Sequence, residues 1–164
     1  MRVKIIAVGT RMPAWVQAGV DEFSKRLSHD LPLQWVEIEL AKRTDSNPVN
    51  ARRAEAKLIA EAIPRGAFVV ALEVNGKTMT SESLAAWLQK RQMESEEVVF
   101  LIGGPDGLEP ELSQKAALRW SLSSLTLPHA LVRVVLAEAL YRAMSIVKGP
   151  VSYTHLTLPT ILRV

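Results

Sequence analysis

Two loops rich in small residues are the first candidates for ligand chemistry in this sequence. The glycine loop, Gly103-Gly104-Pro105-Asp106-Gly107, follows an apolar run that ends at Ile102. The serine loop, residues 120–129, is rich in serine and threonine. Loops without bulky side chains allow a ligand to lie against backbone N–H groups. If the two loops leave neighbouring strands, they can together form the walls of one small-molecule site.

Neither loop contains a phosphate, dinucleotide or nucleophile motif. The glycine loop lacks the Gly-x-Gly-x-x-Gly spacing, and no Lys-Ser/Thr pair follows it. Its bare pattern is at least as typical of a turn as of a ligand site. Ser123 and Ser124 lack the Gly-x-Ser-x-Gly context of a serine nucleophile. Composition therefore predicts binding here, without specifying the ligand.

Two charged residues on the last apolar segment are candidates for acid–base chemistry. Glu138 and Arg142 lie four residues apart in a predicted helix whose other side chains are mostly apolar. Residues at this spacing share one face of a helix. Such a pair is more often a surface ion pair than an acid–base pair. On so apolar a helix, however, a charged stripe must face a cleft, a partner or an ion-pair network.

A local cluster of four cations lies around the longest polar break, residues 41–50. It consists of Lys42, Arg43, Arg52 and Arg53. From charge alone, a solvated face is about twice as common an explanation of such a cluster as phosphate binding.

Metal and thiol chemistry have no support in the sequence. The 164 residues include no cysteine, which excludes disulfides, thiolate metal sites and cysteine nucleophiles. His29, His129 and His155 are isolated from one another and from paired carboxylates, so no metal is expected. A net charge of +3 is only mildly basic and does not establish a nucleic-acid partner. No signal peptide is recognisable and no apolar run approaches ~20 residues, so we expect a soluble, cytoplasmic protein without a membrane partner.

The apolar pattern predicts alternating strands and helices. Strands are expected at 3–8, 33–40, 67–72, 98–102 and 118–122, and helices at 13–27, 50–63, 81–92, 109–117 and 129–146. This alternation predicts an α/β domain with a mostly parallel sheet and helices on both faces. Asn75-Gly76 predicts a turn after the third strand. The helix at 129–146 is apolar on several flanks, which predicts self-association.

Four segments closely resemble one family. They are residues 3–10 (VKIIAVGT), 101–108 (LIGGPDGL), 121–129 (SLSSLTLPH) and the apolar stretch 131–143. On these segments the chain resembles the large-subunit ribosomal RNA pseudouridine N3-methyltransferases of the SPOUT superfamily. The resemblance covers residues 1 to about 149, and the paired loop motifs with their spacing make it specific.

The resemblance implies a fold, an assembly and a cofactor. The expected fold is α/β with a C-terminal trefoil knot, against the general preference for unknotted chains. The expected assembly is an obligate homodimer, and the expected methyl donor is S-adenosylmethionine. The positions matching the family's cofactor site are Leu72, Gly103, Gly104, Leu122, Ser123, Ser124, Leu125, Thr126 and Leu127.

The implied substrate is a pseudouridine of large-subunit ribosomal RNA, methylated in the assembled ribosome. N3 of pseudouridine carries a proton, so methyl transfer requires help with deprotonation and alignment of the reacting atoms. Glu138 and Arg142 match family positions near the cofactor cleft and are the candidate catalytic residues. Under this hypothesis the cations Lys42, Arg43, Arg52 and Arg53 become candidate RNA contacts.

Two other functions remain open. One is a knotted RNA-binding or ribosome-binding protein that binds the cofactor but transfers methyl weakly or not at all. The other is a nucleotide-binding α/β domain with unrelated chemistry.

The sequence departs from the family after Gly149. Family members end in a tail resembling His-Pro-Tyr-His-Arg, whereas residues 150–164 here resemble translated sequencing-adaptor read-through. We interpret residues 1–149 as the methyltransferase domain and residues 150–164 as an atypical, non-native tail. Tyr153 and His155 differ in spacing from the family's tail and are not assigned its roles.

Overall fold

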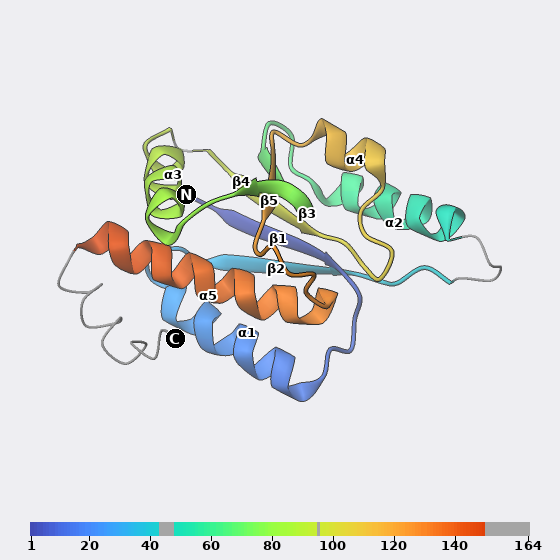
Figure 1. Ribbon diagram of the computed structural model, residues 1–164, viewed down its shortest axis with the longest axis horizontal. Coiled ribbons are helices and arrows are strands. Elements are labelled where there is room, and N and C mark those ends of the chain that lie inside the picture. Colours follow the sequence, from blue (N-terminus) through green and yellow to red (C-terminus); the bar gives the residue numbers. More distant parts are fainter. Residues whose placement is uncertain (43–47, 95, 150–164) are drawn as a thin grey trace.

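A five-stranded parallel sheet forms the centre of the protein (Figure 1). The computed structural model describes residues 1–42, 48–94 and 96–149. The strands are β1 (Val3–Val8), β2 (Leu33–Ile38), β3 (Phe68–Thr78), β4 (Val98–Ile102) and β5 (Leu118–Ser121). They lie in the order β2-β1-β4-β3-β5, and every neighbouring pair is parallel. The predicted α/β fold with a parallel sheet is confirmed.

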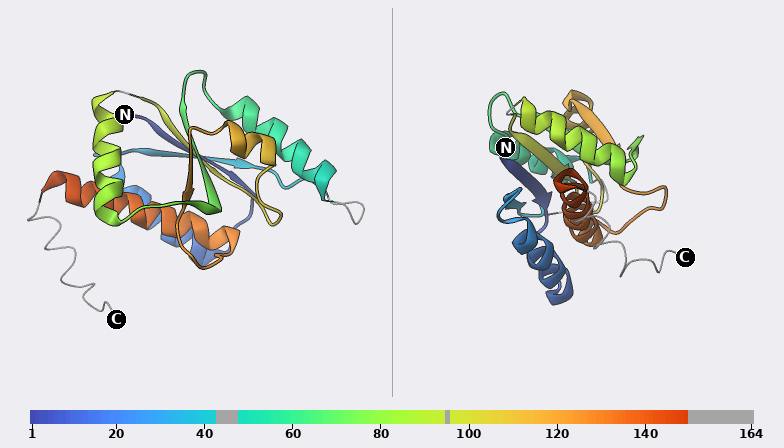
Figure 2. Two further views of the ribbon diagram at one scale, coloured as in Figure 1. Left: turned by 45° about the horizontal axis from the view of Figure 1, so that its top comes forward. Right: turned by 90° about the vertical axis from the view of Figure 1, so that its left-hand side faces the viewer.

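Helices cover both faces of this sheet, as predicted (Figures 1 and 2). One face carries α1 (Ala14–Leu27), α3 (Ser81–Met93) and α5 (His129–Lys148), and the other carries α2 (Val49–Ala62) and α4 (Pro110–Lys115). Alternate residues of a strand point to opposite faces. Ile5 of β1 accordingly belongs to the core cluster under α5, while Ile6 packs with Ile59 of α2. None of the described helices is both long and apolar enough to cross a membrane.

The end of β3 differs from the prediction. The strand does not stop at Leu72 before a turn at Asn75-Gly76, but continues to Thr78. Its pairing with β5 shifts register, because Leu72 and Lys77 both lie opposite Trp120. A Cβ on Gly76 would lie 2.7 Å from the backbone nitrogen of Trp120. Glycine at this position therefore permits the close approach of two strands, and the predicted turn was wrong.

The last helix finds much of its cover within the chain. α5 packs against α1 on one side and α3 on the other. A Cβ on Gly19 of α1 would lie 3.1 Å from a side-chain carbon of Val134, which shows how closely α1 and α5 approach. Leu136, Leu140 and Ala143 of α5 are fully buried. Other apolar residues on this helix, including Leu131 and Val135, are only half-buried.

Candidate functional site

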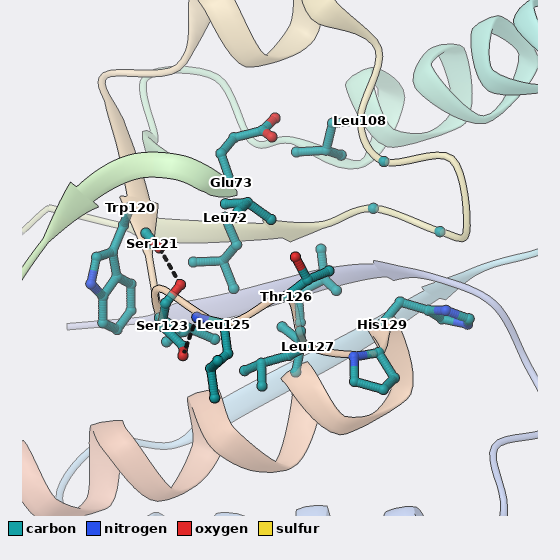
Figure 3. A pocket seen from close by; sticks show the side chains of 18 of the residues that line it. Leu72, Glu73, Leu108, Trp120, Ser121, Ser123, Leu125, Thr126, Leu127 and His129 are labelled. Carbon is teal, nitrogen blue, oxygen red and sulfur yellow. Dashed lines mark hydrogen bonds between the residues drawn. The ribbon is translucent and has the colours of Figure 1, made fainter.

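A cavity of about 620 Å³ lies where the middle of β3 and the carboxyl ends of β4 and β5 meet the start of α5 (Figure 3). Its walls come from residues 72–74, 102–105, 107–108, 120–123, 125–129 and 132. Most of the lining side chains are apolar, with a few hydroxyl groups among them. A volume of this size is typical of sites for nucleotide-like small molecules, which cluster at the carboxyl ends of parallel strands.

The glycine loop forms one wall and is shaped by its own backbone. The N–H of Gly107 donates to the carbonyl of Gly104 at 3.0 Å, and Gly107 has a left-handed φ of 76°. A Cβ on Gly103 would lie 2.6 Å from the carbonyl carbon of Gly107. Glycine at 103 is therefore required by the tight return of the loop itself, because any side chain there would collide with backbone.

The serine loop forms the opposite wall and is held by its own hydroxyl groups. The hydroxyl of Ser121 donates to the carbonyl of Ser123 at 2.9 Å, and the hydroxyl of Ser123 accepts from the N–H of Leu125 at 2.9 Å (Figure 3). Within the described ranges, residues 123–127 make no backbone–backbone hydrogen bond. Apart from the Ser123 carbonyl and the Leu125 N–H, which these hydroxyl groups occupy, the backbone donors and acceptors of this loop remain available to a ligand.

The structure brings together nearly all the predicted cofactor residues. Leu72, Gly103, Gly104, Leu122, Ser123, Leu125, Thr126 and Leu127 line the cavity. Ser124 is exposed and does not line it. These residues come from three separate segments of the chain, so their convergence is a property of the fold. Their role in binding stays a prediction.

The candidate catalytic pair lies elsewhere in this chain. Arg142 Nε donates to Glu138 Oε2 at 3.1 Å on α5, and neither residue lines the cavity. Their side chains are 22% and 35% exposed, respectively, which is the environment of a half-buried helix ion pair. Their catalytic role stays a prediction.

The predicted cation cluster separates into different environments. Lys42 and Arg53 are exposed, and Arg43 lies outside the described residues. Arg52 Nε donates to Glu109 Oε2 at 2.9 Å, with both side chains mostly buried. Arg52 therefore joins α2 to the start of α4, and Lys42 and Arg53 are the described members of the cluster that face solvent.

Sequence reasoning missed a buried arginine that fixes α5 against the sheet. Arg133 is 3% exposed and forms an ion pair with Glu37 of β2 at 2.5 Å. Its second guanidinium nitrogen donates to the carbonyls of Val8 and Gly9, at 3.3 and 2.8 Å. Arg133 lies within the helix expected at 129–146, but the sequence carries no signal for a partner 96 positions away.

Glu73 was also missed, although it lines the cavity directly after Leu72. Its position at the end of a predicted strand was the one available signal. Among the described residues, no group of three His, Asp or Glu side chains could hold a metal ion.

Fold and site together define a class of protein. A parallel α/β sheet carries an apolar cavity at its carboxyl edge, and the cavity walls combine glycine, small hydroxyl residues and free backbone groups. This combination is that of a domain that binds a nucleotide-like cofactor.

Comparison with known proteins identifies the family. Residues 1–152 match the family described as "Predicted SPOUT methyltransferase". The ribosomal RNA large subunit methyltransferase H of Hahella chejuensis is 45% identical over 150 residues, which cover 91% of this chain and 96% of that protein. The protein of the same name from Acidithiobacillus ferrooxidans is 49% identical over 91% of this chain and 94% of its own length. The chain therefore belongs to the SPOUT methyltransferases, in the family of ribosomal RNA large subunit methyltransferase H.

Solved structures share the fold at low sequence identity. A probable methylase family protein from Haemophilus influenzae superposes with a TM-score of 0.56 at 12% identity, over 88% of this chain and 66% of its own. A putative methylase family protein from Neisseria gonorrhoeae superposes with a TM-score of 0.54 at 16% identity, over 85% of this chain and 81% of its own.

Proposed function

We propose that this protein uses S-adenosylmethionine to methylate N3 of a pseudouridine in the large-subunit ribosomal RNA of the assembled ribosome. The observation that carries the proposal is the cavity walled by the glycine and serine loops, in a chain of this family. The relatives' shared name, a large-subunit ribosomal RNA methyltransferase, supports the substrate class.

The cavity fits the proposed cofactor by size and by chemistry. S-adenosylmethionine combines a flat adenine, a polar ribose and a charged amino-acid end. Leu72, Leu122 and Leu127 offer apolar surface. The backbone groups of residues 123–127 that the serine hydroxyls do not occupy offer donors and acceptors for polar edges. When bound, the cofactor supplies an electrophilic methyl group.

The chain's own residues would hold the donor and exclude water around it. The glycine loop and the serine loop form a preorganised cleft, so little ordering is left to occur on binding. Glu138 and Arg142 remain our candidates for helping N3 lose its proton. Because this pair does not line the cavity of its own chain, such a role requires that a second copy of the chain bring it near the reacting atoms.

A homodimer is part of the proposal. Trp15 of α1 is 61% exposed, one helical turn before Gly19, where α1 touches α5. Leu131 and Val135 of α5 are half-buried apolar residues. A second copy covering these residues would bury the apolar surface that α1 and α3 leave open. Light scattering at micromolar concentration should give the mass of a dimer, and a monomer would contradict it.

We also propose the trefoil knot and the domain limits that the resemblance implied. The glycine and serine loops meet at one cavity, which is compatible with threading of the chain between β4 and α5. Residues 1–149 would form the whole methyltransferase domain, in keeping with relatives that match over 150 residues. The tail 150–164 lies outside the described residues. Action on assembled ribosomes would place the protein in the cytoplasm.

The direct test uses S-adenosylmethionine labelled on its methyl group. Ribosomes from a strain lacking the modification should become labelled in large-subunit RNA, and naked RNA much less. Binding of the cofactor without any transfer would favour the alternative of a ribosome-binding protein with little or no catalysis.

A further inference from the structure

Glu73 brings a negative charge into an otherwise uncharged cavity wall. Among the described residues that line the cavity, it is the only carboxylate, and no lysine or arginine lines the cavity with it. In Figure 3 its carboxyl group projects toward Leu108, across the cavity from Thr126 and Leu127. Because Glu73 is half-buried, water screens its charge less than at an open surface.

The strand β3 is irregular where this carboxylate borders the cavity. In a regular strand, consecutive side chains point to opposite faces. Leu72 and Glu73 keep this alternation, since in Figure 3 Leu72 points toward Thr126 and Glu73 points away from it. Both residues nevertheless line the cavity, and the pairing with β5 shifts register directly after them, between Leu72 and Lys77. Strand irregularities of this kind are common next to functional sites. Gly76 allows the irregularity by letting the backbone of Trp120 approach closely.

Glu73 has no protein partner to neutralise it. The structure gives it no hydrogen bond or ion pair with any described residue, and its side chain is half-buried. A half-buried carboxylate without a partner is unfavourable. A cation bound in the cavity would offset this cost, whereas a neutral ligand would not.

We infer that Glu73 selects the charged methyl donor over the spent product. The inference rests on the proposed function, because it concerns the same cavity and cofactor. S-adenosylmethionine and S-adenosylhomocysteine share their adenosine and amino-acid parts and differ in one methyl group and one positive charge at sulfur. A carboxylate in the cavity stabilises the sulfonium form and gains little from the thioether. Loss of the methyl group thus weakens binding, which favours release of the product and entry of a new donor.

The test is isothermal titration calorimetry of the full chain with both ligands. We expect Glu73→Gln to weaken binding of S-adenosylmethionine about tenfold and of S-adenosylhomocysteine by less than about threefold. Glu73→Asp keeps the charge and should keep most of the preference for the sulfonium ligand. Glu61→Gln removes the same charge from the exposed face of α2 and should leave both affinities unchanged.

The outcomes separate this inference from the proposed function. Equal losses for both ligands with Glu73→Gln would mean that the carboxylate binds a part that they share, such as the ribose, and would overturn charge selection. Unchanged affinity for both ligands in that variant would overturn it as well. If the unmodified chain binds neither ligand, the proposed function itself fails. Titration of the unmodified chain alone shows this, without any Glu73 variant.

Discussion

At the scale of single residues, the glycine loop shows how a backbone requirement shapes a binding site. Gly103 looked from the sequence like a position that lets a ligand approach. In the structure, its missing side chain makes room for the loop's own residues Gly107 and Leu108. The loop is thus a rigid wall whose shape depends on glycine, and ligand binding depends on that shape.

We therefore expect Gly103→Ala to damage both stability and binding. A Cβ 2.6 Å from backbone carbon forces the loop to move, at a cost of about 2 kcal/mol in unfolding free energy. Affinity for S-adenosylmethionine should fall at least about tenfold, because the displaced loop is a wall of the cavity. Thermal unfolding and calorimetry measure the two effects.

Gly66→Ala is the matched control for backbone strain alone. Gly66 has a φ of +80°, a Cβ added there would meet no atom within 4 Å, and the residue does not line the cavity. We expect a loss of about 1 kcal/mol and unchanged affinity. If the Gly103→Ala variant bound S-adenosylmethionine as tightly as the unmodified chain, the glycine loop would not be part of the site.

At the scale of elements, the position of α5 depends on the buried Arg133. This side chain ties α5 to the carboxyl end of β1 and to Glu37 of β2, next to the segment that begins at Gly9. Arg133→Met should lower the unfolding free energy by about 3 kcal/mol, because it removes the hydrogen bonds to two buried carbonyls and leaves Glu37 without its partner. Chemical denaturation measures the loss.

Arg142→Met is the control on the same helix. Its ion pair with Glu138 is half-exposed, so the cost should stay within about 1 kcal/mol. Equal losses for the two variants would mean that Arg133 is no more important to the fold than a surface pair.

The exposed cations around α2 give a further prediction about an element, since they would contact RNA as a group. Replacing Lys42 and Arg53 together by Ala should weaken ribosome binding and lower its salt dependence by roughly one unit of slope per cation. Affinity for S-adenosylmethionine should not change. Binding measured at several salt concentrations tests this, and an unchanged slope would make both side chains ordinary solvated residues.

Arg52 should behave differently from these two cations. Its pair with Glu109 joins α2 to α4, so Arg52→Ala should act mainly on stability, and Glu109→Gln should reproduce its effect. A change in salt slope for Arg52→Ala without loss of stability would instead make it an RNA contact.

Most elements could be predicted from the sequence because their signals are local. β4 is a run of five buried residues, and α1 shows helical spacing of apolar residues, so periodicity alone located both. The end of β3 could not be predicted in this way. Asn75-Gly76 carries the local signal of a turn, whereas the requirement on Gly76 comes from Trp120, which is distant in sequence.

The site residues differ in the same way, between those with a local sequence signal and those without one. Leu72, Gly103 and Leu122 could be named from the resemblance, since their segments match a known pattern. Arg133 could not be named, because its role depends on a partner in β2, and Glu73 had only the weak signal of following a predicted strand. The contact of Arg133 with Glu37 has no signal in the local composition of the sequence.

At the scale of the whole molecule, activity should depend on the cavity, a second copy of the chain and an unusual tail. The described residues that line the cavity all fall between 72 and 132, and we expect cofactor binding not to depend on residues 150–164. Positioning of the target by the family's tail is the step that we expect this chain to lack, and loss of a positioning element commonly costs about a hundredfold in rate. Replacing residues 150–164 by the ending His-Pro-Tyr-His-Arg should therefore raise turnover.

The most direct measurement is mass spectrometry of large-subunit RNA from ribosomes incubated with S-adenosylmethionine and either form of the chain. The ribosomes come from a strain that lacks the modification, and ribosomes without added protein serve as the control. We predict methyl on N3 of one pseudouridine, formed slowly by the chain with its present tail and faster with the replaced ending. Absence of methylated pseudouridine with both forms, in ribosomes that carry the unmodified target, would contradict the proposed function.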